Sequence, residues 1–176
     1  MPKTGDLTKR LKKIKLLLLD VDGTMSDKGI FIGDREDIKR FDVRDGAAVF
    51  YARWMGLRVA MVSGRASKAV TRRATELEIK DVYQDSLDKV PVLEKLLVKY
   101  KLHPKEVLHM GDDLTDLPIF KRVGVGVAVA DAVPEVKKRA HYVTRLPGGH
   151  GAVREVVEMV LKAQRTWSKL LERYLE

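Results

Sequence analysis

The feature that most constrains the fold of this chain is a short apolar run that ends in two aspartates. Leu16–Leu19 is entirely apolar, and Asp20 and Asp22 follow it in the string DVDGT. A run of this length and composition predicts a buried strand. Alternation along an extended chain would place both aspartate side chains on one side. Two carboxylates held this close repel each other, so the pair needs a cation or a proton. Mg²⁺ meets that need in phosphate chemistry, because it binds carboxylate and phosphate oxygens together.

Two structural alternatives exist for this string. It also opens an EF-hand loop, which needs an oxygen ligand at position 5, glycine at position 6 and glutamate at position 12. Here these positions hold Thr24, Met25 and Phe31, which argues against an EF-hand. A strand that ends in a solvated aspartate turn remains open on this string alone.

The length and composition predict one domain spanning residues 1–176. The chain has no cysteine, which excludes disulfides and thiolate metal sites. Its apolar stretches fall short of the ~20 residues of a membrane span. Leu16–Leu19 is also too short for the apolar core of a signal peptide. We therefore expect a cytoplasmic protein with no membrane partner.

The charge is basic, with a formal net charge of +9 from 34 Lys and Arg against 25 Asp and Glu. The densest basic cluster runs from Lys9 to Lys15, at the end of an N-terminus (residues 1–13) that we expect to be loose. Elsewhere basic and acidic residues are interspersed. Positive potential steers small phosphates as well as nucleic acid. The charge therefore fits a small anionic substrate at least as well as a nucleic-acid partner.

Apolar, β-rich runs alternate with amphipathic helical patterns along the chain. The predicted strands are Leu16–Asp20, Arg58–Val62, Asp81–Gln84, Val107–Met110, Val125–Val129 and His141–Val143. The predicted helices are Gly46–Met55, Lys68–Leu77, Lys89–Tyr100, Leu114–Arg122 and Pro134–Arg139. This alternation predicts an α/β fold with a mostly parallel sheet covered on both faces. Ligands bind such sheets at the carboxyl ends of the strands, where Asp20 and Asp22 are expected.

Two segments depart from this alternation. Residues 29–41 predict a β-hairpin inserted after the first strand, with its turn at Gly33-Asp34. Residues 152–175 show apolar positions at spacings of four and three, broken only by Gln164. They predict one helix of about 35 Å, at 1.5 Å per residue. Because a helix of this length is longer than a small domain normally needs, its end could contact a neighbouring subunit.

Further candidate residues follow later in the chain. Ser63 ends an apolar strand and is followed by Gly64, so its hydroxyl and the nearby backbone N–H groups could bind a phosphate oxygen. An ordinary helix cap is the alternative. Lys89 opens a helix, where most lysines are solvated surface charges.

The string GDDLTD places Asp112, Asp113 and Asp116 at another strand end. Capping a helix needs one carboxylate, so three within five residues indicate another role.

Taken in order, DVDGT, Ser63, Lys89 and GDDLTD resemble the motifs of the haloacid-dehalogenase (HAD) superfamily of phosphotransferases. The resemblance implies a Rossmannoid three-layer sandwich. It implies that Asp20 is the nucleophile, forming an aspartyl-phosphate, and that Asp22 is the general acid and base. Ser63 and Lys89 would hold the phosphoryl oxygens.

The same resemblance implies a Mg²⁺ site. Its ligands would be the Asp20 carboxylate, the backbone carbonyl of Asp22 and the Asp112 carboxylate. Asp113 would act largely through water, and Asp116 would orient its neighbours. A bound Mg²⁺ would also screen the carboxylates from each other.

Many HAD enzymes carry a cap domain, either between the first two motifs or between Ser63 and Lys89. Neither gap is long enough here, so we expect a capless chain. A site without a cap is open to water, which favours a macromolecular substrate or an oligomer whose neighbours close the site.

Within that superfamily, the sequence more closely resembles the capless, tetrameric branch of 3-deoxy-D-manno-octulosonate (KDO) 8-phosphate phosphatases. The matching strings are FDVRDG, SGR, GDDL, VAVADA, YVTR and GGHGAVRE, within residues 14–164. The resemblance implies that Arg65 and Arg73, with Gly64 beside them, contact the sugar acid. It also implies that the hairpin builds a homotetramer. His150 stands where the family usually has arginine, and TMS at residues 24–26 departs from its usual residues.

We therefore predict a Mg²⁺-dependent phosphoric monoester hydrolase acting on KDO 8-phosphate, a small sugar acid phosphate. One alternative is the same chemistry on a sialic-acid-type 9-phosphate. A nucleic-acid 3′-phosphatase would need aromatic stacking platforms, and aromatic residues make up 6% of the chain. A non-catalytic HAD assembly module is disfavoured by the intact Asp20, Asp22, Lys89 and Asp112.

Overall fold

The computed structural model describes residues 4–34 and 37–175. Its centre is a six-stranded parallel sheet in the order β5-β4-β1-β6-β7-β8. The strands are β1 (Leu16–Asp20), β4 (Arg58–Val62), β5 (Asp81–Tyr83), β6 (Val107–Gly111), β7 (Val125–Ala128) and β8 (Tyr142–Val143). The helices are α1 (Thr4–Leu11), α2 (Val43–Trp54), α3 (Lys68–Glu76), α4 (Val90–Tyr100), α5 (Leu117–Phe120), α6 (Pro134–Arg139), α7 (Ala152–Ala163) and α8 (Trp167–Leu175), with 3₁₀ turns η1 (Pro104–Glu106) and η2 (Leu114–Asp116).

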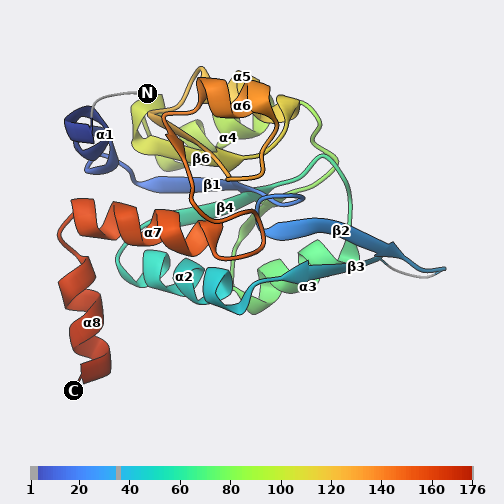
Figure 1. Cartoon of the computed structure of the whole chain (residues 1–176), viewed down its shortest axis with the longest axis horizontal. Helices are drawn as coiled ribbons and strands as arrows, with labels where there is room; N and C mark the ends of the chain where they lie inside the picture. Colours follow the sequence, from blue (N-terminus) through green and yellow to red (C-terminus); the bar gives the residue numbers. More distant parts are fainter. Residues whose placement is uncertain (1–3, 35–36, 176) are drawn as a thin grey trace.

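The sheet lies between two helical layers, with α2, α3 and α7 on one face and α4 on the other (Figure 1). The leucines of β1 alternate between these layers. Leu17 and Leu19 join the cluster that includes α2 and α7, and Leu16 and Leu18 join the cluster that includes α4. Burying each leucine contributes about 1.5–3 kcal/mol relative to leaving it exposed. The predicted α/β three-layer fold is confirmed, and β1 is its central, fully buried strand.

The expected loose N-terminus is wrong for residues 4–11, which form α1; residues 1–3 lie outside the described part of the chain. Leu7 and Leu11 stand four residues apart and both pack against the core. The prediction rests on the basic residues around these two leucines, and it overlooks the short apolar face that the leucines form. The N-terminus is therefore part of the packed domain.

The predicted single helix over residues 152–175 is also wrong, because α7 ends at Ala163 and α8 begins at Trp167. Gln164 donates through Nε2 to the carbonyls of Leu11 (3.2 Å) and Ile14 (2.8 Å), and Arg165 has a φ of +61°. The polar break in the apolar pattern is thus a link to the N-terminal segment, where the chain turns. After this turn α8 leaves the direction of α7 (Figure 1).

The hairpin is confirmed, with β2 (Ser26–Ile32) antiparallel to β3 (Asp37–Phe41). It begins at Ser26 rather than at residue 29. Residues 35–36, which follow the predicted turn at Gly33-Asp34, lie outside the described residues. The pair projects beyond the sheet (Figure 1). Its side chains Phe31, Ile32 and Ile38 are 62–79% exposed. The hairpin therefore presents an apolar surface.

The other element boundaries shift by a few residues. The predicted helix over residues 114–122 is a 3₁₀ turn followed by the short α5, which has Pro118 in its first turn. Among residues 4–34 and 37–175, each helix is too short or too polar to cross a membrane.

Candidate active site

Three adjacent strands bring the predicted site residues together. Asp20 is the last residue of β1, Ser63 follows β4, and Asp112 follows β6. In the sheet β1 lies between β4 and β6, and Asp20 pairs in register with Val62. Because all three strands are parallel, their carboxyl ends meet at one edge. Residues far apart in the sequence therefore converge where the motifs predicted.

Lys89 connects two carboxylates of the site, those of Asp20 and Asp116. Its Nζ lies 2.6 Å from Asp20 Oδ1 and 2.6 Å from Asp116 Oδ1. The lysine side chain is buried, unlike most lysines. Burial alone would lower its pKa, but the charges of Asp20 and Asp116 outweigh this and raise the pKa. Lys89 is therefore a buried ammonium that fixes the orientation of Asp20.

The surroundings of Asp20 and Asp112 disfavour the ionised form of both side chains. Burial raises the pKa of Asp20 well above its ordinary value, and the charge of Asp116 adds to this against the opposing effect of Lys89. Burial and the charge of Asp116 also raise the pKa of Asp112 to about 7. Lys28 Nζ lies 4.0 Å from Asp112 Oδ2 and offsets this in part. Both groups would gain from a further cation between them.

The donor set fits that cation. One oxygen each from Asp20, Asp112 and Asp116 lies within 4.8 Å of the others. Gly23 has a φ of +87°, and a Cβ built on it would meet Asp112 Oδ2 at 2.1 Å. Glycine is therefore required for the chain after Asp22 to approach the Asp112 carboxylate. Carboxylate and carbonyl oxygens are the ligands that Mg²⁺ takes.

Asp116 belongs to this cluster, but each of its two carboxylate oxygens already has two hydrogen-bond partners. Its Oδ1 contacts Lys89 and His109 Nε2 (2.8 Å), and its Oδ2 accepts the backbone N–H groups of Asp112 (3.0 Å) and Asp113 (3.2 Å). Burial alone would raise its pKa, but hydrogen bonds and charge from His109 and Lys89 lower it. We therefore assign Asp116 to supporting its neighbours rather than to metal coordination. Asp113 caps η2 through its Oδ1, which accepts the N–H of Leu114 at 2.7 Å.

Asp22 turns its carboxylate to a different partner. Its Oδ1 lies 2.5 Å from Nζ of Lys39, a buried lysine of β3, and its Oδ2 accepts a long hydrogen bond of 3.5 Å from Ser63 Oγ. Sequence reasoning missed Lys39. The available signal was alternation along β3, which places Lys39 opposite in direction to the exposed Ile38 and Arg40. The hairpin therefore contributes a cation to the site.

The segment after β4 is a loop. Ser63 Oγ accepts the N–H of Arg65 at 3.2 Å, and its single hydroxyl hydrogen has two alternative acceptors, the Arg65 carbonyl at 3.1 Å and Asp22 Oδ2 at 3.5 Å. The cap of α3 is Ser67, whose side chain accepts from Val70. Ser63 and Gly64 therefore precede the helix, and the exposed Arg65 lies beside them.

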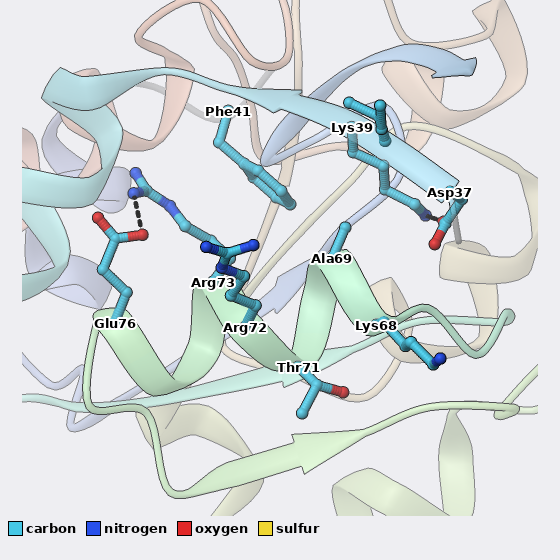
Figure 2. A pocket seen from close by; sticks show the side chains of 10 residues that line it. Asp37, Lys39, Phe41, Lys68, Ala69, Thr71, Arg72, Arg73 and Glu76 are labelled. Carbon is cyan, nitrogen blue, oxygen red and sulfur yellow. Dashed lines mark hydrogen bonds and ion pairs between the residues drawn. The ribbon is translucent and has the colours of Figure 1, made fainter. Parts of the chain in front are cut away.

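Arg73 lies in a separate cavity of about 640 Å³ between β3 and α3. Figure 2 shows Phe41 and Lys39 of β3 facing the residues of α3 across it. Arg73 donates to Glu76 Oε2 (2.9 Å) and to the Asp42 carbonyl (3.1 Å). Lys39 lines this cavity and also reaches Asp22, so the cavity adjoins the site. Substrate contacts by Arg65, Arg73 and Gly64 remain a prediction.

Comparison with known proteins gives concordant matches. Residues 74–155 match the family of haloacid dehalogenase-like hydrolases. The KDO 8-phosphate phosphatase of Yersinia pestis is 43% identical over 164 residues, covering 93% of this chain and 88% of that protein. A crystal structure of the Y. pestis phosphatase has a TM-score of 0.91 over 93% of this chain and 89% of the other. That of the Moraxella catarrhalis phosphatase, in complex with magnesium, phosphate and KDO, is 34% identical, with a TM-score of 0.94 over 98% and 99%.

The parallel sheet with four aspartates and a buried lysine at its carboxyl edge defines a hydrolase of the haloacid dehalogenase-like class. Within that class, the chain belongs to the family of KDO 8-phosphate phosphatases. The resemblance inferred from the sequence motifs is thereby confirmed.

Proposed function

We propose that this protein hydrolyses KDO 8-phosphate to KDO and phosphate, a step of lipopolysaccharide precursor synthesis, with Mg²⁺ as cofactor. The observation that carries the proposal is the bridge from Lys89 to Asp20, 2.6 Å long, beside Asp112, whose charge is only partly offset. The 43% identity to phosphatases of this name supports the substrate.

Asp20 attacks the phosphorus and forms an aspartyl-phosphate, while the bond to the sugar oxygen breaks. Lys89 holds Asp20 Oδ1, which leaves Oδ2 for the attack. Ser63 and Lys89 then donate to the phosphoryl oxygens and offset the charge that develops on them. The buried ammonium is already oriented, so this stabilisation needs little reorganisation.

Asp22 protonates the departing sugar oxygen and afterwards takes a proton from the water that hydrolyses the aspartyl-phosphate. Lys39 holds one of its carboxylate oxygens, and Ser63 contacts the other at 3.5 Å before the substrate binds. Water then attacks the phosphorus, releases phosphate and restores Asp20.

The carboxylates of Asp20 and Asp112 and the carbonyl of Asp22 would hold Mg²⁺, with Asp113 reached through water. When bound, Mg²⁺ neutralises charge on the phosphoryl group and screens the carboxylates from each other. Asp116 keeps Lys89 and the backbone of residues 112–113 in place.

The cavity beside Lys39 suits the rest of a sugar acid. Besides Lys39, the cations Lys68, Arg72 and Arg73 line it. Arginine binds carboxylates through two parallel hydrogen bonds, so a carboxylate remote from the phosphate has partners there. A sialic-acid-type 9-phosphate carries the same two groups and is the nearest alternative substrate.

We further propose that four copies assemble through the hairpin and that the protein acts in the cytoplasm. The exposed Phe31, Ile32 and Ile38 support the assembly, because an apolar patch of this kind marks an interaction surface. The loop at residues 148–151 packs on its own chain, since a Cβ at Gly148 would clash with the Gly23 carbonyl at 1.8 Å. Within one subunit this loop therefore lies against the segment that follows Asp22.

Phosphate release from a panel of phosphorylated sugars in the presence of Mg²⁺ tests the proposal. The panel contains KDO 8-phosphate, a sialic-acid-type 9-phosphate, a simple hexose phosphate and a 3′-phosphorylated oligonucleotide. We expect the highest kcat/KM with KDO 8-phosphate. A preference for the oligonucleotide, or the absence of turnover with every member, would contradict the proposal.

A further inference from the structure

His109 is a fully buried histidine that the reaction described above does not use. It lies in the middle of β6, and its relative exposure is 0%. Within Val107–Gly111 it is the only side chain that can hydrogen-bond strongly; its neighbours are apolar or glycine. A histidine in an otherwise apolar central strand needs partners for both ring nitrogens.

Both ring nitrogens have partners, and both partners are acceptors. Nδ1 lies 2.9 Å from the carbonyl oxygen of Leu18, and Nε2 lies 2.8 Å from Asp116 Oδ1. A neutral imidazole has one N–H and one bare nitrogen. The carbonyl of Leu18 cannot donate. A neutral ring would therefore set a lone pair against an acceptor unless Asp116 itself carried a proton.

The other partners of Asp116 oppose that proton. Oδ1 accepts from the ammonium of Lys89 at 2.6 Å, and Oδ2 accepts two backbone N–H groups. These three donors, one of them a buried cation, all stabilise the carboxylate anion. Asp116 is therefore ionised, and the nitrogen of His109 that faces it donates.

We propose that His109 is held as an imidazolium and is a positioning residue for Asp116 and, through it, for Lys89. The buried charges are then paired as Asp20 and Asp116 against Lys89 and His109. Because His109 neutralises Asp116, Lys89 is free to serve Asp20 and the incoming phosphoryl group. The charge of Asp112 remains available for the metal.

The surrounding structure holds the ring in this orientation. The Phe120 ring meets it edge-on, with centroids 5.8 Å apart and an interplanar angle of 78°. Phe120 in turn occupies space that a side chain at residue 126 would fill, since a Cβ there would meet its ring at 2.7 Å. Gly126, the neighbour of His109 across the β6–β7 ladder, therefore makes room for this packing.

Nitrogen NMR of the histidine rings in the intact wild-type protein, at neutral pH and without substrate, tests the charge directly. His109 is assigned by loss of its signals in His109→Gln. We expect two protonated ring nitrogens, each with a slowly exchanging hydrogen. One bare nitrogen at His109 would overturn the proposal. The charge is measured on the wild-type protein and does not depend on the proposed phosphatase reaction.

The kinetic part of the test rests on the proposed function and uses both KDO 8-phosphate and p-nitrophenyl phosphate, a generic ester. We expect His109→Phe to lower kcat about 10–100-fold, the usual effect of losing an outer hydrogen-bond partner in a metal-dependent site, with a smaller change in KM. His141→Gln is the matched control, because His141 is a partly buried histidine whose ring accepts the N–H of Gly126. Its kcat should equal that of the wild type.

A double-mutant cycle with Asp116→Asn separates positioning from general loss of packing. Once Asp116 is neutral, His109→Phe should cause little further loss of kcat per folded molecule, so the two effects are not additive. Full additivity, or a kcat of His109→Phe equal to that of the control, would overturn the positioning role. Wild-type turnover of the generic ester without turnover of KDO 8-phosphate would count against the proposed substrate alone.

Discussion

Two aspartate–lysine pairs with equal nitrogen–oxygen distances lie at opposite edges of the sheet, and they have different roles. Asp22 meets Lys39 at 2.5 Å beyond the carboxyl end of β1, and Asp81 meets Lys99 at 2.5 Å at the amino end of β5. Asp81 also accepts from the hydroxyls of Tyr83 and Tyr100. Burial alone would raise its pKa, but these partners lower it.

The surroundings of the two pairs explain the difference. Asp22 shares its edge with Asp20 and Asp112, whose pKa values are raised by burial and by the charge of Asp116. Asp81 is a carboxylate whose partners all stabilise its charge. The comparison teaches that ion-pair length does not distinguish function from stability. What marks the functional edge is a cluster of carboxylates whose negative charge the nearby cations of the chain only partly offset.

The largest loss of activity is expected from a change at Asp20, on the edge of the sheet that Asp22 shares. Asp20→Asn should abolish turnover, because phosphate-monoester hydrolysis is among the slowest uncatalysed reactions and the amide is no substitute nucleophile. The fold should persist, since the amide can still meet Lys89. Single-turnover assays and circular dichroism check the two parts. Near-normal turnover by a folded Asp20→Asn protein would contradict the covalent mechanism.

A smaller loss is expected at Asp22, the functional member of the two pairs. Asp22→Asn should lower kcat about 10²–10⁴-fold, the usual contribution of general acid–base catalysis. The loss should be smaller for p-nitrophenyl phosphate, whose leaving group needs less protonation. Steady-state kinetics on both esters measure this. An equal loss on both esters would assign Asp22 to dephosphorylation of Asp20 alone.

Arg73 tests whether the adjoining cavity belongs to the site. Arg73→Ala should raise KM for KDO 8-phosphate about tenfold or more, since hydrogen bonds to charged groups contribute about 1.5–3 kcal/mol. The KM for p-nitrophenyl phosphate, which lacks the carboxylate, should change little. The alternative is that Arg73 serves only Glu76 and the Asp42 carbonyl. Equal effects on the two substrates would favour that alternative.

The smallest effect on activity is expected at the other pair. Asp81→Asn should lower the free energy of unfolding by about 1.5–3 kcal/mol and leave kcat unchanged. Because folding lowers the pKa of Asp81 below its ordinary 3.8, its contribution is complete above that pH and is lost as pH falls through the folded value. Urea unfolding of both proteins between about pH 2 and 6 should show the difference shrinking toward acid. A pH-independent difference would contradict the assignment.

The sequence predicted the elements that depend on local pattern. The bounds of β1 and β4 match their apolar runs, and the motif aspartates lie at the strand ends as expected. Alternation along β3 could have indicated that Lys39 is buried, but not that its partner is Asp22. The role of His109 could not be predicted, because it depends on the Leu18 carbonyl, which is remote in sequence. Local charge or apolar periodicity carries no record of such pairings.

The wrong predictions at the two ends of the chain, a loose N-terminus and a single C-terminal helix, have the same cause. Gln164 interrupts an otherwise continuous apolar stripe, and its meaning depends on two carbonyls more than a hundred residues away. The basic cluster near the N-terminus conceals the short apolar face of α1. In both places a tertiary contact decided between structures that the local pattern left equally open.

The most direct test of the central claim is thermal unfolding of the wild type and Asp112→Asn with and without Mg²⁺. Without metal, Asp112→Asn should be more stable than the wild type near neutral pH, because the buried carboxylate with its raised pKa opposes folding. Mg²⁺ at about 100 times its Kd should stabilise the wild type by about 2.7 kcal/mol and Asp112→Asn much less. Equal stabilisation of both proteins by Mg²⁺, or none of the wild type, would contradict the claim that a divalent cation completes this carboxylate cluster.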